Sequence, residues 1–341
     1  MKNMSYTLAV MLLLAAPLAS KAQGRNANEL ATNLPGATTF AAPPEGFSVL
    51  AASDEQLADY GFPPRPDPAA SPKEYAAWSK AMLASRRRIV PSLQQTSIFH
   101  GPARLREAGK STQENTLQSY NWSGYIDFTG GTRFAPSAFS TIATVVVVPT
   151  ALEAFGVCSD VADYASSWVG FDGANSNDVV QAGIEFDAVC FEGVTATLYS
   201  PWFEWYPSSE MRITNLPIAP GDDYFVEVWN TSATQAYAYL VNENANEAVI
   251  IGFNPPLGTK LVGNSAEWIT EAPNSNGATA TLTNYIADPF WNAYGVTHNN
   301  RPFDPGSSEA IIMLDNNNVE ISYPTLLGDS AFVVQNVNTT E

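Results

Sequence analysis

The chain has 341 residues, with 34 acidic residues against 16 lysines and arginines, and a formal net charge of −18. That length is enough for one large domain or two smaller ones. The charge is unevenly divided: residues 119–341 carry 25 acidic and four basic residues, a charge of −21, whereas residues 1–118 carry +3. Such an acidic region excludes nucleic acid as its partner. Its self-repulsion falls when carboxylates protonate, which suits an acidic environment, although many exported proteins are acidic for solubility alone.

The chain opens as a secretory signal peptide, of a kind that resembles bacterial ones. Lys2 precedes the apolar run Leu8–Leu14, and small residues up to Ala22 fit a cleavage site, so residues 1–22 are the predicted signal peptide. The apolar run is too short to span a membrane, and no later segment approaches 18 apolar residues. We therefore expect a soluble, secreted protein, extracellular or periplasmic, with no membrane partner.

Residues 23–118 are predicted to form a leader. Residues 23–70 are rich in Ala, Pro and polar residues without sustained periodicity, which predicts extended or poorly ordered chain. A helix is expected near residues 72–88, with Pro72 in its first turn and Arg86–Arg88 at its end, where cations suit the helix dipole. Residues 107–119 are polar and predict a flexible linker.

Residues 119–341 have the texture of an all-β domain. Short runs rich in Val, Ile, Thr and aromatic residues recur between Gly, Pro, Asn and Asp, and convincing helical patterns are lacking. Many short strands over roughly 220 residues predict one β-sandwich or barrel.

The cysteine and histidine content limits the chemistry. An exported protein permits a disulfide between Cys158 and Cys190, but two buried free thiols are equally consistent with the sequence. With two histidines and no CxxC motif, we expect no metal site and no cofactor.

Several predicted strands have one apolar face and one face that mixes aromatic, acidic and glycine residues. Because side chains alternate along a strand, Val180 and Ala182 face one way whereas Gln181 and Glu185 face the other. Tryptophans seldom face solvent, so the recurrence of the mixed face predicts a concave ligand groove. An aromatic core with satisfied polar groups would explain any single strand equally well.

Elimination narrows the reactive groups of this groove. Ser-His-Asp and Cys-His mechanisms need a histidine base, but His100 lies in the predicted leader and His298 in a predicted loop. The sequence has no G-x-S-x-G or H-E-x-x-H motif and no pair of aspartic-protease motifs. The reactive groups are therefore expected to be carboxylates, helped by amides.

Six motifs in order resemble one family: NWSGY, SSWVGFDG, VVQAGIEFD, WFEWYP, PGDDYFVEV and NSAEWITEAP. Together they resemble the glutamic peptidases (eqolisins), acid endopeptidases best known from fungi, most strongly over residues 120–275. The resemblance implies a two-sheet antiparallel β-sandwich of the lectin-like, concanavalin-like jelly-roll type over residues 119–341. It also implies synthesis as a proenzyme and protein or peptide substrates, and we expect a monomer.

By motif, the resemblance places a catalytic dyad on Gln181 and Glu267. Glu267 would act as general base on a water molecule, and the Gln181 N–H would stabilise the tetrahedral oxyanion. Gly183 would leave space for substrate. The other matched positions would bind substrate or support the site, the acids as a hydrogen-bonded cluster that tunes Glu267: Trp122, Trp168, Asp172, Glu185, Trp202, Glu204 and Tyr206.

The leader gains a role on this interpretation. Its basic residues could cover the acidic groove as an inhibitor, which acid would release for self-cleavage near residues 107–119; the alternative is a spacer that is never removed. Two other functions remain open for the domain itself. One is a carbohydrate-binding module, and the other is a glycoside hydrolase that uses Glu204 and Glu267.

Overall fold

The computed structural model describes residues 26–84, 87–106, 116–128, 138–158 and 160–337. The predicted signal peptide, Arg86 and residues 107–115 of the predicted linker lie outside these ranges. Neither of the two α-helices in the described chain is long and apolar enough to cross a lipid bilayer.

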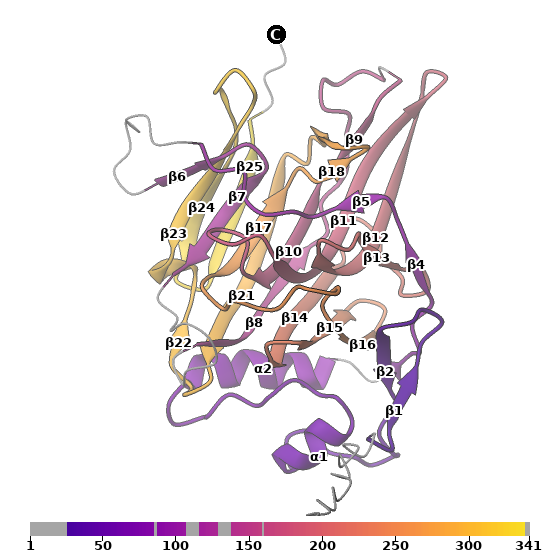
Figure 1. Ribbon diagram of the computed structural model, residues 1–341, viewed down its shortest axis with the longest axis vertical. Coiled ribbons are helices and arrows are strands. Elements are labelled where there is room, and N and C mark those ends of the chain that lie inside the picture. Colours follow the sequence, from indigo (N-terminus) through magenta and orange to yellow (C-terminus); the bar gives the residue numbers. More distant parts are fainter. Residues whose placement is uncertain (1–25, 85–86, 107–115, 129–137, 159, 338–341) are drawn as a thin grey trace, which may run out of the picture.

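Two β-sheets pack face to face, and the predicted antiparallel β-sandwich is confirmed (Figure 1). In spatial order, the first sheet contains β13 (Met211–Ile213), β12 (Val194–Tyr206), β11 (Val179–Phe191), β10 (Ser166–Phe171), β17 (Ala266–Glu271), β7 (Trp122–Asp127) and β23 (Glu309–Leu314). The second contains β21 (Ala287–Thr297), β8 (Phe139–Val147), β14 (Asp223–Ser232), β15 (Gln235–Asn242) and β16 (Glu247–Phe253).

Two strands join the sheets, and several short elements border them. The joining strands are β24 (Glu320–Gly328) and β25 (Ala331–Asn336), which link β23 to β21. The short elements are β6 (Thr116–Ser119), β9 (Ala162–Tyr164), β18 (Asn274–Ser275), β19 (Ala278–Thr279), β20 (Thr281–Leu282), β22 (Pro302–Phe303) and the 3-10 helix η1 (Pro305–Ser307). Because β6 pairs with β23, the predicted boundary at residue 118 falls inside a strand of the sandwich.

The main core lies between the sheets and follows the predicted alternation. Val180, Ala182 and Val169 of the first sheet pack in one cluster with Ile142 and Val226 of the second. Each fully buried side chain of this size contributes about 1.5–3 kcal/mol of hydrophobic stabilisation. Since these residues face inward, the mixed aromatic and acidic face of the first sheet points away from the core.

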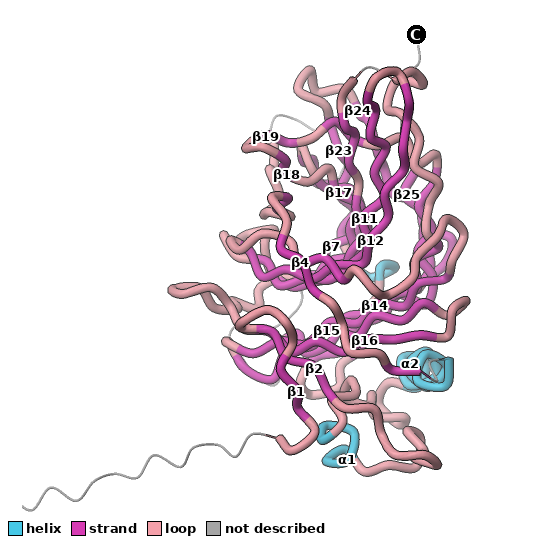
Figure 2. The backbone as a smooth tube through the Cα atoms, turned by 90° about the vertical axis from the view of Figure 1, so that its right-hand side faces the viewer, coloured by secondary structure: helices cyan, strands magenta, loops and turns pink. Residues whose placement is uncertain are grey.

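The leader packs on the outside of both sheets. Its elements are β1 (Glu29–Ala31), β2 (Ala37–Phe40), α1 (Asp54–Asp59), α2 (Pro72–Ala84), β3 (Arg87–Arg88), β4 (Leu93–Gln95) and β5 (Ile98–Phe99). Figure 2 shows α1 and α2 beyond β15 and β16, on the side away from β11 and β12. There Leu57 and Trp78 are buried against Phe225 and Tyr239 of the second sheet.

The structure agrees with the predictions for the leader in part. Residues 26–70 are extended or irregular over much of their length, and their apolar side chains find partners on the second sheet, where β2 pairs with β16. The predicted helix near residues 72–88 begins at Pro72 and ends at Ala84, short of the predicted end. Arg88 belongs to β3, where its guanidinium lies over the Phe62 ring and donates to the carbonyls of Ala41 and Tyr60.

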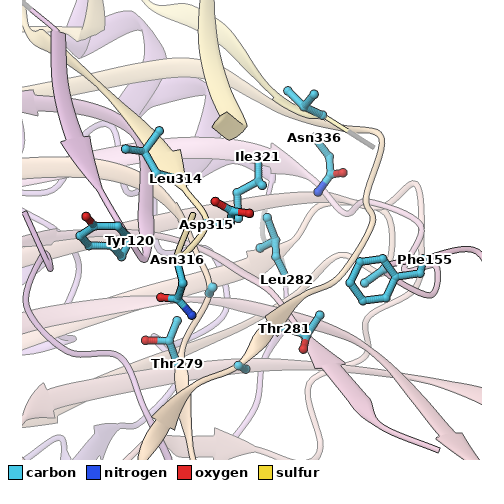
Figure 3. A pocket seen from close by; sticks show the side chains of 14 residues that line it. Tyr120, Phe155, Thr279, Thr281, Leu282, Leu314, Asp315, Asn316, Ile321 and Asn336 are labelled. Carbon is cyan, nitrogen blue, oxygen red and sulfur yellow. The ribbon is translucent and has the colours of Figure 1, made fainter. Parts of the chain in front are cut away.

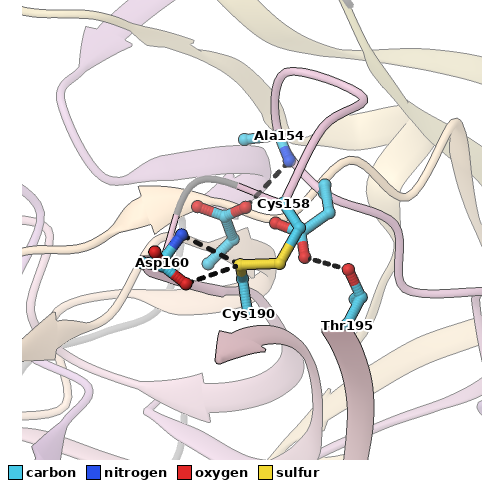
Figure 4. Close-up of a disulfide and its surroundings, with 7 residues drawn as sticks. Ala154, Cys158, Asp160, Cys190 and Thr195 are labelled. Atoms are coloured by element: carbon cyan, nitrogen blue, oxygen red, sulfur yellow. Dashed lines mark hydrogen bonds between the residues drawn. A yellow bond between two sulfur atoms is a disulfide. The ribbon is translucent and has the colours of Figure 1, made fainter. Parts of the chain in front are cut away.

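A disulfide joins Cys158 to Cys190, so the cysteines are not free thiols (Figure 4). The bond ties the loop after β8 to the end of β11 across 32 residues of sequence. The Asp160 backbone N–H donates to the Cys190 sulfur at 2.9 Å, and the Ala154 N–H donates to the Asp163 carboxylate at 2.8 Å. This network secures one end of the β11–β12 hairpin.

Candidate active site

Gln181 and Glu267 lie on either side of one glycine. In the first sheet β10 runs between β11 and β17, and Gly170 of β10 pairs with Gln181 on one side and Glu267 on the other. Neighbouring strands are about 4.8 Å apart, so the two α-carbons are roughly 9–10 Å apart. The residues that flank each of them along the chain belong to the core between the sheets, so both side chains point to the outer face. The predicted pair is thus brought together.

Gly170 and Gly183 both lie where a side chain would collide with the neighbouring strand. A Cβ at Gly170 would lie 2.5 Å from the Val180 carbonyl oxygen and 2.8 Å from the Gln181 Cβ. At Gly183 a Cβ would lie 2.1 Å from the Ser167 carbonyl oxygen and 2.6 Å from the Trp168 Cβ. The sheet therefore requires glycine at both positions, and the expectation that Gly183 leaves room for substrate stays a prediction.

A segment of the leader covers this face, and we call residues 96–104 the strap. It enters where β4 pairs with β13 at the sheet edge, and it continues as β5, which pairs with β18. It leaves where the Ala103 N–H donates to the Gly173 carbonyl at 3.0 Å. In Figure 1 this purple segment crosses in front of β11 and β12.

His100, a fully buried residue of the strap, contacts Gln181 and Glu204 through its backbone. The Gln181 Nε2 donates to the His100 carbonyl oxygen at 2.5 Å. The His100 N–H donates to the Glu204 carboxylate at 3.1 Å. A peptide unit of the chain's own leader therefore occupies the groove beside Gln181.

The His100 side chain fills a fully buried cage. Its ring stacks on Trp202, with centroids 3.7 Å apart and planes 8° apart. Its Nε2 lies 3.2 Å from a Glu210 oxygen and 3.4 Å from a Glu185 oxygen. On the other side of the ring, Nδ1 lies 3.2 Å from the Ser166 hydroxyl and 3.5 Å from a Glu271 oxygen.

The acids around His100 favour its cationic form. Burial alone lowers the pKa of His100, but Glu185, Glu210 and Glu271 outweigh that effect and hold this pKa well above the usual value. The Trp168 Nε1 fixes Glu271 by donating to its carboxylate at 2.8 Å, and the Arg212 Nε lies 3.2 Å from Glu210.

Glu267 is fully buried, and the Ser265 side chain lies close enough to its carboxyl group to act as a hydrogen-bond donor. Burial raises the pKa of Glu267 well above its usual value, and the charge of nearby Asp172 raises it further. The Asp172 carboxylate accepts the backbone N–H groups of Val262, Gly263 and Asn264 at 2.7–3.0 Å. Asp172 thereby shapes the loop that leads into β17, and burial raises its own pKa to about 7.

The other predicted site residues divide into two groups. Trp122 and Trp168 meet edge to face with centroids 4.9 Å apart, and with Trp202 they form an apolar cluster on the outer face of the first sheet. Tyr206 packs at the edge of this cluster and lies against Gly101 of the strap. Glu185 and Glu204 contact His100, so of the three predicted acids only Asp172 is placed beside Glu267 as expected.

Three residues of the same cage are of the types that bind metal ions. His100, Glu185 and Glu210 each offer one ligand atom, and these atoms lie within 4.8 Å of one another. A metal needs a neutral imidazole nitrogen, whereas both nitrogens of the favoured imidazolium carry protons. The cage therefore fits a cationic side chain better than a metal ion.

One cavity borders the strap, and a second lies next to the first. One, of about 480 Å³, lies along Phe99, Gly101 and Arg104 and reaches Tyr206 and Glu271. The other, of about 330 Å³, shares Ala272 and Thr279 with the first and extends to Tyr120 and Asp315 (Figure 3). Asp315 is the one acidic residue in its lining, so this second cavity has no acid–base pair of carboxyl groups.

Sequence reasoning missed three members of the site: His100, Glu210 and Glu271. His100 was assigned to the leader and set aside, yet it is the residue at the centre of the groove. Glu271 could have been found, because it shares a strand face with Glu267. Glu210 lies in a turn before β13, and no alternation rule places its side chain.

Known proteins resemble this chain in sequence. A model of the peptidase A4 family matches residues 120–336. Aspergillopepsin-2 of Aspergillus niger is 28% identical over 171 residues, which cover 50% of this chain and 58% of that protein. Scytalidopepsin B of Scytalidium lignicola is 28% identical over 172 residues, which cover 49% and 58%. The chain thus spans less than two thirds of the length of these two relatives.

A solved structure shares the fold. The crystal structure of scytalido-glutamic peptidase with a transition state analog inhibitor is 21% identical, with a TM-score of 0.53 over 64% of this chain and 98% of that chain. The family model covers well over half of the chain and includes both Gln181 and Glu267. The resemblance to the glutamic peptidases is confirmed, and the chain belongs to the peptidase A4 family.

Proposed function

We propose that this protein is an acid endopeptidase that hydrolyses peptide bonds in proteins with a Gln181/Glu267 dyad. One observation carries the proposal: the Gln181 amide donates to a peptide carbonyl held in the groove, and a buried carboxyl group, that of Glu267, lies across Gly170 from it. A glycoside hydrolase would need an acid where Gln181 stands, and a binding module would need no buried carboxyl group beside it.

The chemistry follows from the two side chains. Ionised Glu267 removes a proton from a water molecule as that water attacks the scissile carbonyl. The Gln181 N–H, a neutral donor that does not titrate, stabilises the oxyanion of the tetrahedral intermediate. The C–N bond then breaks, and Glu267 returns its proton to the leaving amine. Because only one carboxylate must be ionised, the site works in moderate acid.

The leader keeps the proenzyme latent in this scheme. The strap excludes substrate from Gln181, and burial raises the pKa of Glu267 and so disfavours the carboxylate that a general base requires. Burial raises the pKa of Glu185, Glu204 and Glu271, and the His100 cation offsets part of that rise, so this part of the attraction is present while they are ionised. It is lost as the pH falls and they take up protons.

Export is part of the proposal. The predicted signal peptide at residues 1–22 resembles bacterial ones and suits a secreted protein. The acidic domain suits a monomer that works in an acidic medium. Fractionation of producing cells, with N-terminal sequencing of the exported form, tests this step. An intact Met1 on the exported protein, or retention in the cytoplasm, would contradict it.

The test of activity is degradation of a denatured protein between about pH 2 and 6 with pepstatin present. We expect acid proteolysis that pepstatin does not inhibit and that Glu267→Gln and Gln181→Ala each reduce by at least about 100-fold. Glu192→Gln, at the exposed tip of the β11–β12 hairpin, is the matched control and should keep full activity.

Two outcomes would contradict the proposal. The first is the absence of proteolysis by protein whose leader has been removed in acid. The second is proteolysis that survives Glu267→Gln. In either case, binding and hydrolysis of glycans by the same preparation would decide between the two alternative functions.

A further inference from the structure

The cage around His100 is more specific than latency requires. A segment that only blocks a groove can do so with apolar side chains, whereas this strap inserts one ring among acids that are themselves completely buried. Burying carboxylates without a partner is unfavourable, so a cage of this kind is built for a cation.

The position of the cage beside Gln181 indicates which residue of a substrate it holds. Gln181 donates to the carbonyl oxygen of His100, which is the atom that becomes the oxyanion when that peptide bond is attacked. The residue that supplies this carbonyl is by definition the P1 residue of a substrate, and the next residue, Gly101, is P1′. The pocket that holds the His100 side chain is therefore the pocket for P1.

We propose that this cage is the S1 subsite of the enzyme, that it selects peptide substrates with a protonated histidine at P1, and that His100–Gly101 is the bond cut in its own leader. The inference rests on the proposed function. It names the substrate class of the same site, and it moves the processing point away from the 107–119 linker predicted from the sequence.

The shape of the cage favours histidine over other cations. The flat ring stacks on Trp202, and its two N–H groups point to opposite walls, toward Glu210 and Glu271. Phenylalanine could stack but would leave both walls unpaired. Lysine has no planar group to stack on Trp202, and arginine carries its planar group on a side chain longer than that of histidine.

Every charged group near the ring acts in this selection. Glu185, Glu210 and Glu271 face the ring nitrogens, Glu204 holds the backbone N–H, Asp187 lies beside Glu185, and Arg212 contacts Glu210. The acids outnumber the single arginine, so an imidazolium is attracted. While the surrounding acids are ionised, a bound histidine has a raised pKa, so its binding weakens as the pH rises above the free value of about 6.5. Binding also weakens at lower pH, where these acids take up protons.

Cleavage of the leader is a balanced hydrolysis. Water adds to the His100 carbonyl carbon while Glu267 takes its proton, and the His100–Gly101 C–N bond breaks. The proton passes from Glu267 to the Gly101 nitrogen. One water is consumed, and the products are a carboxyl terminus at His100 and an amino terminus at Gly101.

Peptides of the strap sequence Ser-Ile-Phe-His-Gly-Pro-Ala-Arg test the subsite. We expect acid hydrolysis between His and Gly, with kcat/KM at least about tenfold higher than for the same peptide with Phe, Gln or Lys at P1. The ratio of His to Phe should fall as the pH rises above about 6.5. Glu210→Gln and Glu271→Gln should bring it toward one, whereas Glu192→Gln should leave it unchanged.

The full-length protein tests the processing bond. Intact-mass measurement during incubation at acid pH should show a large fragment that begins at Gly101, slowed at least about tenfold by His100→Gln. His298→Gln is the matched control, because it changes the only other histidine, which lies outside the groove. Glu267→Gln should abolish the fragment.

The outcomes separate the two proposals. Equal or faster cleavage with Phe at P1, by enzyme that still degrades denatured protein, would overturn the S1 assignment and leave the peptidase proposal standing. A fragment that begins elsewhere in wild type, or one that forms in Glu267→Gln, would overturn the processing bond. No hydrolysis of any peptide or protein would overturn the proposed function itself.

Discussion

The leader holds the two sheets of the sandwich in opposite ways. On the second sheet, residues 26–84 bury Trp78, Leu57 and other apolar side chains against an aromatic surface. On the first sheet, the strap makes backbone hydrogen bonds and inserts one imidazole among carboxylates. The first contact has the character of a domain core, and the second has that of a bound substrate.

These two kinds of contact indicate which part of the leader the domain can release. Removing residues 26–84 would expose Phe225, Trp229, Tyr239 and Val241 as a continuous apolar surface, which soluble proteins rarely tolerate. Removing the strap would expose a polar groove that water can solvate. Residues 26–84 therefore suit a permanent clamp on the second sheet, and the strap suits a releasable cover over the first.

The largest loss of stability is expected from Trp78→Ala, a change within the clamp. Trp78 is fully buried between α2 and the second sheet, so its truncation should lower the free energy of unfolding by about 3–5 kcal/mol. Denaturant unfolding followed by circular dichroism measures this loss. Leu83→Ala on the exposed side of the same helix is the control and should change stability by less than about 0.5 kcal/mol. Equal effects of the two variants would show that α2 adds nothing to the domain.

Acidity should stabilise the fold through buried carboxyl groups. Burial raises the pKa of Asp288 from 3.8 to about 7, although Ser167 and Thr270 donate to its carboxyl group. A raised carboxyl pKa gives stability that is complete below the unfolded value and is lost as the pH rises toward the folded value. Between about pH 4 and 7 this one group should remove roughly 4 kcal/mol. Burial raises the pKa of Asp187, on the strap side of β11, to about 8, which adds a loss of the same sign.

Thermal unfolding across this pH range checks the sign. We expect Tm to fall from moderately acidic to neutral pH, and Asp288→Asn to flatten the dependence because the amide does not ionise. A Tm that rises toward neutral pH would contradict the assignment of these buried groups. Trp78→Ala should lower the whole curve without changing its slope, which distinguishes the apolar clamp from the titrating sheet.

The sequence predicted the strand residues of the active site far better than the leader residue that covers them. Alternation along single strands placed Gln181 and Glu267 on the outer face, because the residues beside them in the sequence are core residues. No such rule indicates what lies on top of that face. His100 is 81 residues from Gln181 and 110 from Glu210, and its place depends on the path of a leader with no periodic pattern.

The disulfide provides a perturbation outside both leader contacts. Its loop of 32 residues predicts a loss of roughly 2–4 kcal/mol when Cys158 and Cys190 are both changed to serine. The bond lies at the far end of the β11–β12 hairpin, so amide hydrogen exchange of the strap and of α2 should keep its wild-type pattern relative to the rest of the domain. Selective opening of the strap in this variant would mean that the hairpin, rather than His100, holds the cover in place.

The smallest change in stability is expected from Glu210→Gln, which keeps the side-chain shape but removes one charge from the cage. Amide hydrogen exchange over residues 97–104 at neutral pH should speed up roughly tenfold, because the His100 cation loses a partner at 3.2 Å. Exchange over residues 54–84 should stay as in wild type, and Tm should move by no more than about 2 °C. Glu192→Gln supplies the control for a lost surface charge. If both parts of the leader responded together, the strap could not open without releasing the clamp, and the division of the leader into a permanent and a releasable part would be wrong.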